Sequence, residues 1–395
     1  MDEIFGRENS RSKGKSKEDS MKFTNVKKTV LTGVVMGAAL FTFNFTALPG
    51  SVNLPAVVQA AEANFTGEEA GKLYLAGKLY TGVALKDGKF YNYKEGVQGV
   101  AYTGIFTGKY LNVSTGAQAQ INGVYYQNGS VFSGVAGRKY YVKGLLQSKF
   151  TGWKKVGGKI YYFTKGVAPA KGFKMLKSYT GGSTKYKYYF KEDGSLSTNL
   201  FKDWGYNKCI KTKMTIEINT KTHNVTFYLY DKKTKKYIIP AKTVLCSTSA
   251  KANGTPRGHF FLMKTAAKRW VRVPNNNTRF YQWATRIAGT PTLVHSSVYT
   301  KYGNNKALSA SYYNKLGNSN TSYCVRMQAV NAKIVYDVAK KTPKKQRTWI
   351  NIVKKNKKGP FGIVKLKHTT GKLKNSRKTD PTDPVLFPGN PFSVK

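Results

Sequence analysis

Short aromatic runs, each closed by a glycine turn, dominate residues 64–200 and limit what this part of the chain can form. Tyrosine pairs recur along it, at Tyr125-Tyr126, Tyr140-Tyr141, Tyr161-Tyr162 and Tyr188-Tyr189. Turns of the Asp-Gly or Asn-Gly kind separate the runs, at Asp87-Gly88, Asn128-Gly129 and Asp193-Gly194. A run of this composition followed by such a turn is typical of a β-hairpin. Because one hairpin buries too little surface to be stable alone, we expect a stacked array of degenerate, irregularly spaced repeats.

The clearest repeat unit is Thr151–Phe163, with the sequence TGWKKVGGKIYYF. It resembles the short aromatic-glycine repeats of cell-wall-binding and glucan-binding proteins. Those families bind choline or sugars on stacked aromatic rings, and a flat ring face suits both kinds of ligand. The resemblance makes Trp153, Tyr161 and Tyr162 the candidate ligand-binding residues. The alternative is that these rings form the hydrophobic core of the hairpin stack.

Beyond about Lys211 the pattern changes to longer alternating strands, at residues 214–219, 225–230 and 237–245. Residues 329–339 are the best helix, with apolar side chains at 330, 334, 335 and 338. The fold class expected for the whole chain is therefore mainly β, with few helices. The last residues are rich in Pro, Asp and Lys, so we expect them to be disordered or wrapped on the surface.

The N-terminal residues indicate export. Three lysines, at 22, 27 and 28, precede an apolar run over 29–48. A Pro-Gly breaker follows at 49–50, and residues 58–60 (Val-Gln-Ala) have small side chains at the positions that a signal peptidase recognises. This order is typical of a signal peptide, although the apolar run approaches the roughly 20 residues that span a bilayer. We therefore expect a cleaved signal or an uncleaved anchor. In either case the rest of the chain lies outside the cell and touches the membrane only through this segment.

The chain is strongly basic, with 67 Lys and Arg against 18 Asp and Glu and a formal net charge of +49. Such a charge implies an anionic partner. An exported chain rarely meets nucleic acid, so the expected partners are anionic polymers of a cell wall. The expected location is a cell wall or the outer face of a cell, and the resemblance of the repeats to wall-binding proteins implies a Gram-positive bacterium.

The acidic residues are too few for several kinds of catalysis. Residues 211–368 contain 32 Lys and Arg but only three acidic side chains, Glu217, Asp231 and Asp337. These positions argue against a carboxylate-pair glycosidase. The sequence also has no His-Glu-x-x-His motif for zinc and no glycine-rich phosphate loop. We expect neither metal nor cofactor, which leaves thiol chemistry.

Of the three cysteines, Cys324 has the best setting for a nucleophile. It stands just before the expected helix and close to Arg326, and both features would lower its pKa and favour the thiolate. His295 follows an apolar strand and could act as the base. The alternative is that Cys324 is a small buried apolar residue. Cys246 is interpreted as a core residue, whereas Cys209 is unassigned and could pair with Cys246.

Four motifs within residues 211–368 occur in the order found in L,D-transpeptidases, the YkuD-like cysteine enzymes of bacterial walls. They are Cys246–Ser249 (CSTS), Thr255–Phe260 (TPRGHF), Val294–Ser296 (VHS) and Thr321–Arg326 (TSYCVR). The region resembles the catalytic domain of that family. The resemblance implies a β-sandwich catalytic domain after the hairpin repeats. The expected domains are a signal or anchor (1–60), repeats (61–205), a catalytic domain (210–368) and a tail (369–395).

The resemblance also implies a mechanism. Cys324 would attack a carbonyl of a peptidoglycan stem peptide, with His295 as general base and Ser296 steadying the imidazole. Backbone N–H groups of Cys324 and Tyr323 would bind the oxyanion. Arg326 would brace the loop or meet a substrate carboxylate. Tyr299 would line the substrate groove together with other tyrosines of the same segment, Tyr302, Tyr312 and Tyr313.

Two departures from the family pattern stand beside the nucleophile. Ser322 replaces a histidine and Tyr323 replaces a glycine that lets the backbone approach the substrate. The segment between His295 and Cys324 is also longer than usual. The expected activity is cross-linking of stem peptides through a cysteine acyl-enzyme. The alternatives are a hydrolytic L,D-carboxypeptidase and a wall-binding protein without catalysis.

Overall fold

The computed structural model describes residues 64–388, apart from 252–253, 274–275, 342 and 344–345. The expected signal or anchor segment, 1–60, lies outside these residues. Within the described part, no helix has both the length and the apolar character that crossing a membrane requires.

The first half of the described chain consists of antiparallel hairpins, as the aromatic runs predict, with one parallel pairing, between β4 and β7. A six-stranded sheet has the order β6-β5-β4-β7-β8-β9, and the other hairpins form sheets of two or three strands. The strands are β1 (Gly67–Glu69), β2 (Lys72–Leu75), β3 (Lys78–Leu79), β4 (Gly82–Lys86), β5 (Lys89–Lys94), β6 (Val97–Ala101), β7 (Gly104–Asn112), β8 (Gln118–Gln127), β9 (Ser130–Val131), β10 (Gly134–Ala136), β11 (Lys139–Val142), β12 (Leu145–Leu146), β13 (Gly152–Val156), β14 (Lys159–Phe163), β15 (Gly172–Lys177) and β16 (Lys185–Phe190).

Turn glycines join successive hairpins through the backbone. The N–H of Phe90 donates to the carbonyl of Gly129, and the N–H of Tyr140 donates to the carbonyl of Gly166, each at 2.9 Å. Both glycines have positive φ, +78° and +75°. A Cβ on Gly166 would lie 2.5 Å from the carbonyl oxygen of Gln147. These positions therefore require glycine for two reasons, the backbone conformation and the closeness of the next unit.

We expect Gly166→Ala to destabilise the repeats by about 3 kcal/mol, because it combines left-handed strain with a backbone clash. Gly158→Ala is the matched control, since Gly158 has nearly the same φ, +76°, with nothing within 4 Å of its added Cβ. Strain alone costs roughly 1–2 kcal/mol. Urea unfolding followed by near-ultraviolet circular dichroism measures the loss of unfolding free energy in each of the two variants. Equal losses in the two variants would show that the contact between hairpins contributes nothing.

The second half closes into a barrel of eight strands, in the order β18-β17-β25-β20-β21-β22-β24-β19, because β19 also pairs with β18. A ninth strand, β23, pairs in parallel with the end of β19. The strands are β17 (Met214–Asn219), β18 (Asn224–Asp231), β19 (Lys236–Ser249), β20 (Gly258–Arg272), β21 (Phe280–Ile287), β22 (Leu293–His295), β23 (Ser319–Thr321), β24 (Val325–Met327) and β25 (Trp349–Val353). The mainly-β class is confirmed. The sheet closes on itself, so the domain has no two separate sheets facing each other.

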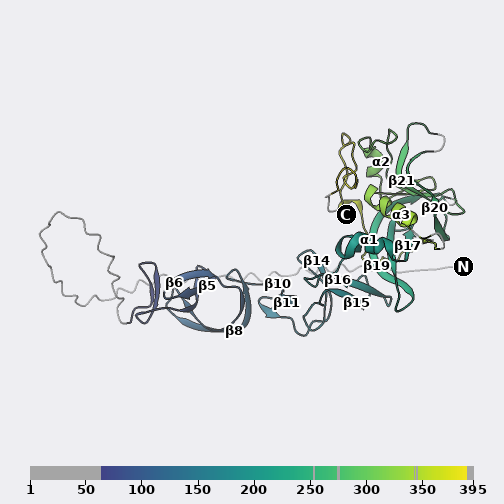
Figure 1. The fold of residues 1–395 in the computed structure, drawn as a ribbon. Helices are drawn as coiled ribbons and strands as arrows, with labels where there is room; N and C mark the ends of the chain where they lie inside the picture. The colour runs from purple at the N-terminus through teal and green to yellow at the C-terminus, as the bar shows by residue number, and fades with distance from the viewer. Residues whose placement is uncertain (1–63, 252–253, 274–275, 342, 344–345, 389–395) are drawn as a thin grey trace, which may run out of the picture. The chain divides into compact units, whose positions relative to one another are not determined.

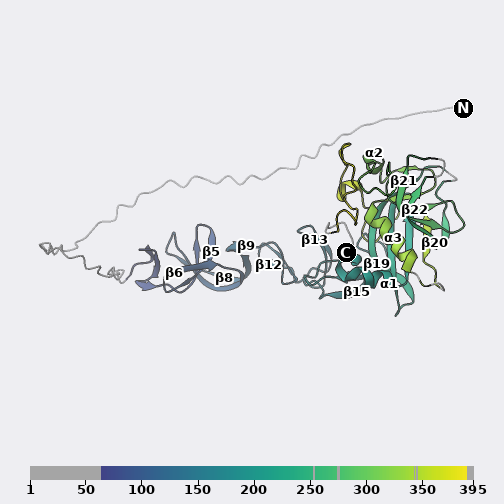
Figure 2. The same cartoon turned by 45° about the horizontal axis from the view of Figure 1, so that its top comes forward.

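Helices are few and short, as expected. α3 (Ala329–Lys341) covers the predicted helix and packs on β20 and β21 (Figure 1, Figure 2). Its apolar face shares one core with inward side chains of the barrel, including Ile216, Phe227 and Val325. The other helices are α1 (Tyr206–Lys211), α2 (Ala310–Asn314), a π-helical turn (Phe201–Gly205) and a 3-10 turn (Leu366–His368).

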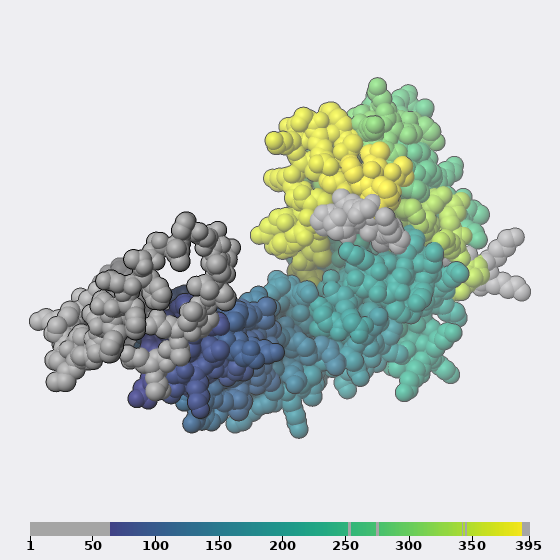
Figure 3. All heavy atoms as spheres, turned by 60° about the vertical axis from the view of Figure 1, so that its left-hand side comes forward, coloured from purple at the N-terminus to yellow at the C-terminus, as the bar shows by residue number. Residues whose placement is uncertain are grey.

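Of the two expectations for the C-terminal tail, the described residues 369–388 fit the one in which the tail wraps onto the domain. These residues lie against the barrel, as the yellow and green atoms show (Figure 3). Asp380, Thr382 and Asp383 are completely buried. Asp380 accepts a hydrogen bond from the N–H of Ala329 at 2.9 Å, where α3 begins. The tail therefore supplies buried carboxylates to a barrel that has few of its own, and one of them stabilises the first turn of α3.

Candidate active site

Strand register places the two candidate catalytic side chains on one face of the barrel. β22 and β24 are parallel neighbours in which Val294 pairs with Val325 and His295 pairs with Arg326. Val294 and Val325 belong to the core. Because side chains alternate along a strand, His295 and Arg326 project from the opposite face, and Cys324 leaves the chain on that same side. The sequence motifs around His295 and Cys324 thus meet through a strand pair.

The other two motifs hold the loop that carries Cys324. Thr255, from the TPRGHF motif, donates its hydroxyl to the carbonyl of Tyr323 at 2.9 Å. Cys246, from the CSTS motif, pairs with Met327 on the neighbouring strand. Within the loop itself, the hydroxyl of Thr321 donates to the carbonyl of Cys324 at 2.6 Å. All four motifs therefore meet at one place.

His295 has one nitrogen fixed and the other free. Its Nδ1 lies 2.6 Å from the carbonyl oxygen of Ser296, so Nδ1 carries the proton and donates. Its Nε2 is buried and has no hydrogen-bond partner among the described residues. Burial, and to a smaller extent Arg326, lower the pKa of His295 to about 3. The imidazole is therefore neutral at pH 7, with Nε2 unprotonated, and burial makes it a weaker base than a free imidazole.

Tyr281 of β21 completes the surroundings of the imidazole. Its ring stacks on that of His295, with centroids 3.6 Å apart and planes 16° apart. Burial raises the pKa of Tyr281 to about 12, and a charge on Cys324 raises it further. Tyr281 is thus near both candidate catalytic groups. Nothing in the sequence singled it out, because its place depends on the register between β21 and β22.

The thiol of Cys324 differs from the expectation of a lowered pKa. Burial raises its pKa above the usual value, while a backbone hydrogen bond with Leu293 and the charges of Arg286 and Arg326 act in the opposite direction. The expected helix-dipole effect is also wrong, because β24 separates Cys324 from the start of α3. At pH 7 Cys324 is therefore a thiol and His295 a neutral imidazole.

A raised thiol pKa predicts slow alkylation at neutral pH. We expect the rate of Cys324 modification by iodoacetamide to rise about tenfold per pH unit from pH 7 to pH 9, because the thiolate fraction rises that way below the pKa. Mass spectrometry of the Cys324 peptide measures the rate. A rate that is already constant above pH 7 would show a preformed thiolate and contradict the assignment.

Arg326 and Ser296 support the site through contacts other than those expected. Arg326 is 3% exposed, and its guanidinium donates to Asn320 and lies 5.5 Å from the centroid of the Tyr312 ring. This favours the bracing role. Ser296 steadies His295 with its backbone carbonyl, not with its hydroxyl, which donates to the carbonyl of Ser297 at 2.8 Å.

The tyrosines proposed for a groove separate into different environments. Tyr299 has no exposed surface and its hydroxyl contacts the amide of Gln282, so it is a core residue and cannot line a groove. Tyr313 is equally buried, whereas Tyr302 is 62% exposed. Beside the nucleophile, Ser322 and Tyr323 are both exposed. Tyr323 therefore remains available to a substrate.

In the repeats, the candidate ligand-binding rings pack in two clusters, Trp153 with Tyr162 and Tyr161 with Phe163. Tyr161 is 5% exposed. Trp153 lies 5.2 Å from the ring centroids of both Tyr162 and Tyr188, and its Nε1 donates to the carbonyl of Lys177 at 3.1 Å. These contacts favour the alternative interpretation, in which the three rings form the core of the hairpin stack.

Comparison with known proteins finds structural likeness only. No family model matches the chain, and no curated protein matches it. A solved L,D-transpeptidase from Mycobacterium smegmatis is 15% identical, with 36% of this chain and 58% of that chain covered and a TM-score of 0.27. A fused Zn-dependent amidase/peptidase/peptidoglycan-binding protein from Clostridium acetobutylicum is 21% identical, with 35% and 51% covered and a TM-score of 0.24.

The N-terminal part has matches of another kind. Choline binding protein F from Streptococcus pneumoniae is 17% identical, with 53% of this chain and 52% of that chain covered and a TM-score of 0.16. The chain thus spans between half and three-fifths of the length of these proteins. It has structural matches among L,D-transpeptidases and among choline-binding repeat proteins, and such low scores say nothing about its chemistry.

Proposed function

We propose that this chain is an exported L,D-transpeptidase that cross-links peptidoglycan stem peptides through a cysteine acyl-enzyme. One observation carries the proposal. Cys324 directly precedes β24, β22 ends at His295, and strand alternation puts both side chains on one face; His295 keeps Nε2 free while Nδ1 is fixed by the Ser296 carbonyl. A nucleophile beside an oriented base is the arrangement that acyl transfer requires.

In the first step, Sγ of Cys324 attacks the carbonyl that links a diamino residue to a terminal D-Ala, and its proton passes to Nε2 of His295. Backbone N–H groups of Cys324 and Tyr323 would stabilise the oxyanion. The tetrahedral intermediate then breaks its C–N bond. D-Ala leaves as a free amine that takes the proton from His295, and the acyl group remains on Cys324 as a thioester.

In the second step, an amine of another stem peptide attacks the thioester carbonyl. His295 removes a proton from this amine and returns it to the departing thiolate, so the enzyme recovers its resting state. Water in place of the amine would give hydrolysis. The acid-poor surroundings suit this mechanism, since a neutral imidazole oriented by a backbone carbonyl needs no carboxylate partner.

The direct test is incubation of the purified protein with a disaccharide tetrapeptide, followed by mass spectrometry. We expect released D-Ala and a cross-linked dimer. A tripeptide product without the dimer would show the hydrolytic alternative, an L,D-carboxypeptidase. Unchanged tetrapeptide would contradict enzymatic acyl transfer and favour a wall-binding protein.

A further inference from the structure

A second concave site lies at the end of the barrel where the turn between β17 and β18 meets β25. Its cavity has a volume of about 300 Å³. The lining residues come from five separate segments of the chain, and they are Thr220, Lys221, His223, Ser249, Ala250, Lys251, Thr255, Arg257, Ser319 and Lys354. Neither Cys324 nor His295 is among them. We call this the basic pocket.

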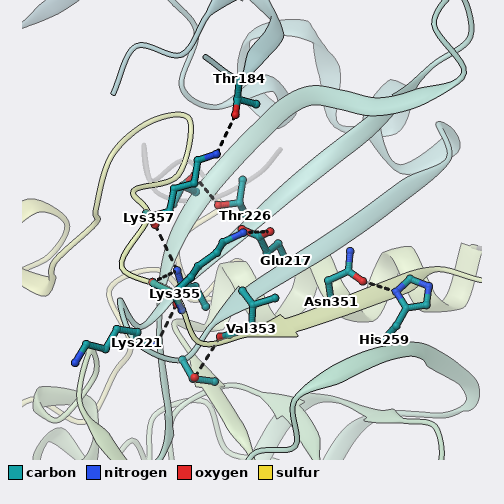
Figure 4. Close-up of polar contacts among 12 residues, drawn as sticks. Thr184, Glu217, Lys221, Thr226, His259, Asn351, Val353, Lys355 and Lys357 are labelled. Atoms are coloured by element: carbon teal, nitrogen blue, oxygen red, sulfur yellow. Dashed lines mark hydrogen bonds and ion pairs between the residues drawn. The ribbon is translucent and has the colours of Figure 1, made fainter. Parts of the chain in front are cut away.

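The basic pocket gathers positive charge without any counter-charge. Lys221, Lys251, Arg257 and Lys354 line it, and no lining residue is acidic. Among the described residues, none of these four cations has a carboxylate within ion-pair distance. By contrast, Lys355 pairs with Glu217 at 2.7 Å (Figure 4). Four like charges around one cavity repel one another, so an anion bound between them would gain from all four.

The pocket is built on a fixed scaffold. Asn219, which is 5% exposed, accepts hydrogen bonds from the N–H of Lys221 at 3.1 Å and of Lys355 at 3.3 Å. Next to it, the hydroxyl of Thr220 donates to the carbonyl of Val353 at 3.2 Å. Figure 4 shows Lys221, Val353 and Lys355 side by side. These bonds tie the turn that carries Lys221 to the segment that carries Lys354.

Neutral hydrogen-bond donors accompany the charges. Thr220, Ser249 and Ser319 are part of the lining, and the Ser249 hydroxyl accepts a hydrogen bond from the N–H of Lys251 at 3.1 Å. His223 bridges Thr248 and Ser319 through its two ring nitrogens, each at 3.3 Å. Burial lowers the pKa of His223, so this ring is neutral at pH 7 and serves as part of the wall.

The basic pocket also shares a residue with the nucleophile loop. Thr255 lines the pocket, accepts a hydrogen bond from the N–H of Ser249 at 3.0 Å and donates to the carbonyl of Tyr323. Tyr323 directly precedes Cys324. A polymer held in the pocket would therefore lie close to the loop where acyl transfer is proposed.

We propose that the basic pocket binds a phosphate group of a phosphodiester polymer. Lysine ammonium groups and an arginine fork are the common protein partners of phosphate, whose several oxygens accept from many donors at once. A single peptide carboxylate has fewer oxygens and would leave most of these donors unused. The pocket would hold the enzyme on a phosphate-bearing strand while Cys324 acts on a neighbouring peptide.

The test is titration of the full-length mature protein with a glycerol-phosphate oligomer by calorimetry at constant ionic strength. The triple variant Lys221→Gln/Lys251→Gln/Lys354→Gln is compared with Lys268→Gln, which removes an exposed cation from β20 outside the pocket. We expect affinity to fall about threefold per pocket lysine, hence about 30-fold in the triple variant, and to change less than twofold in the control.

Two results would overturn the proposal. One is that the triple variant binds the oligomer with unchanged affinity while its circular dichroism matches that of the wild type. The other is equally tight binding of a polyglutamate of the same charge, which would show attraction by the general basic field without recognition of phosphate. Cys324→Ala should bind the oligomer normally, so failure of the proposed catalysis and failure of the pocket remain distinguishable.

Discussion

His295→Asn is expected to lower the rate of acyl transfer by roughly 10²- to 10⁴-fold, which is the usual contribution of a positioned general base. The resting thiol has a raised pKa, and in the proposed mechanism it loses its proton to Nε2 of His295. Loss of the imidazole therefore stops the first step. The measurement is the initial rate of D-Ala release from a disaccharide tetrapeptide.

The barrel offers a matched control for this variant. His259 stacks on Trp349 with ring centroids 4.5 Å apart and contacts Asn351 (Figure 4). It is exposed, on β20. His259→Asn should change the rate less than twofold. If the two variants lose activity equally while both stay folded, His295 is not the base.

Asp383→Ala is expected to lower the free energy of unfolding of the barrel by about 3–5 kcal/mol, because it leaves buried donors unpaired. The Asp383 carboxylate accepts from the amide of Gln282 at 2.7 Å and from the amide of Asn305. The nearby Arg269 guanidinium also donates to Gln282. Urea unfolding followed by tryptophan fluorescence measures the change.

Two comparisons separate this network from an ordinary ion pair. Asp383→Asn keeps one acceptor oxygen and should recover part of the loss. Glu217→Ala breaks the partly exposed contact with Lys355 and should cost no more than about 1 kcal/mol. A loss below about 1 kcal/mol for Asp383→Ala would show that the tail only rests on the barrel surface.

Local pattern predicted three strands of the barrel and its longest helix, but not β20, β21, β23, β24 or β25. Alternating residues gave β17 and β18 within a residue of their bounds, and the apolar spacing over 329–339 gave α3. The candidate nucleophile and base were also found from sequence, by exclusion of other chemistry and by motif. Their meeting depends on the parallel pairing of β22 with β24, which the motif order implies but no local signal shows.

The predictions that were wrong concerned the burial of particular side chains, which is determined by contacts between residues far apart in the sequence. The pKa of Cys324 follows from the side chains packed around it, so proximity to a helix in the sequence gave the wrong direction. Tyr299 and Tyr302 have the same local setting in the sequence, yet one is buried and the other exposed. Asp380 and Asp383 were interpreted as part of a solvated tail. Their burial could not be predicted from local sequence, because the groups that donate to them, on Ala329 and Gln282, lie far away along the chain.

The central claim is that Cys324 forms an acyl-enzyme. Intact-mass measurement after treatment with a carbapenem-type acylating probe tests it most directly. The account predicts one adduct, located on the Cys324 peptide, that is absent in Cys324→Ala and retained in Cys246→Ala, whose thiol is buried. An unmodified wild-type protein, or an adduct that persists in Cys324→Ala, would contradict it.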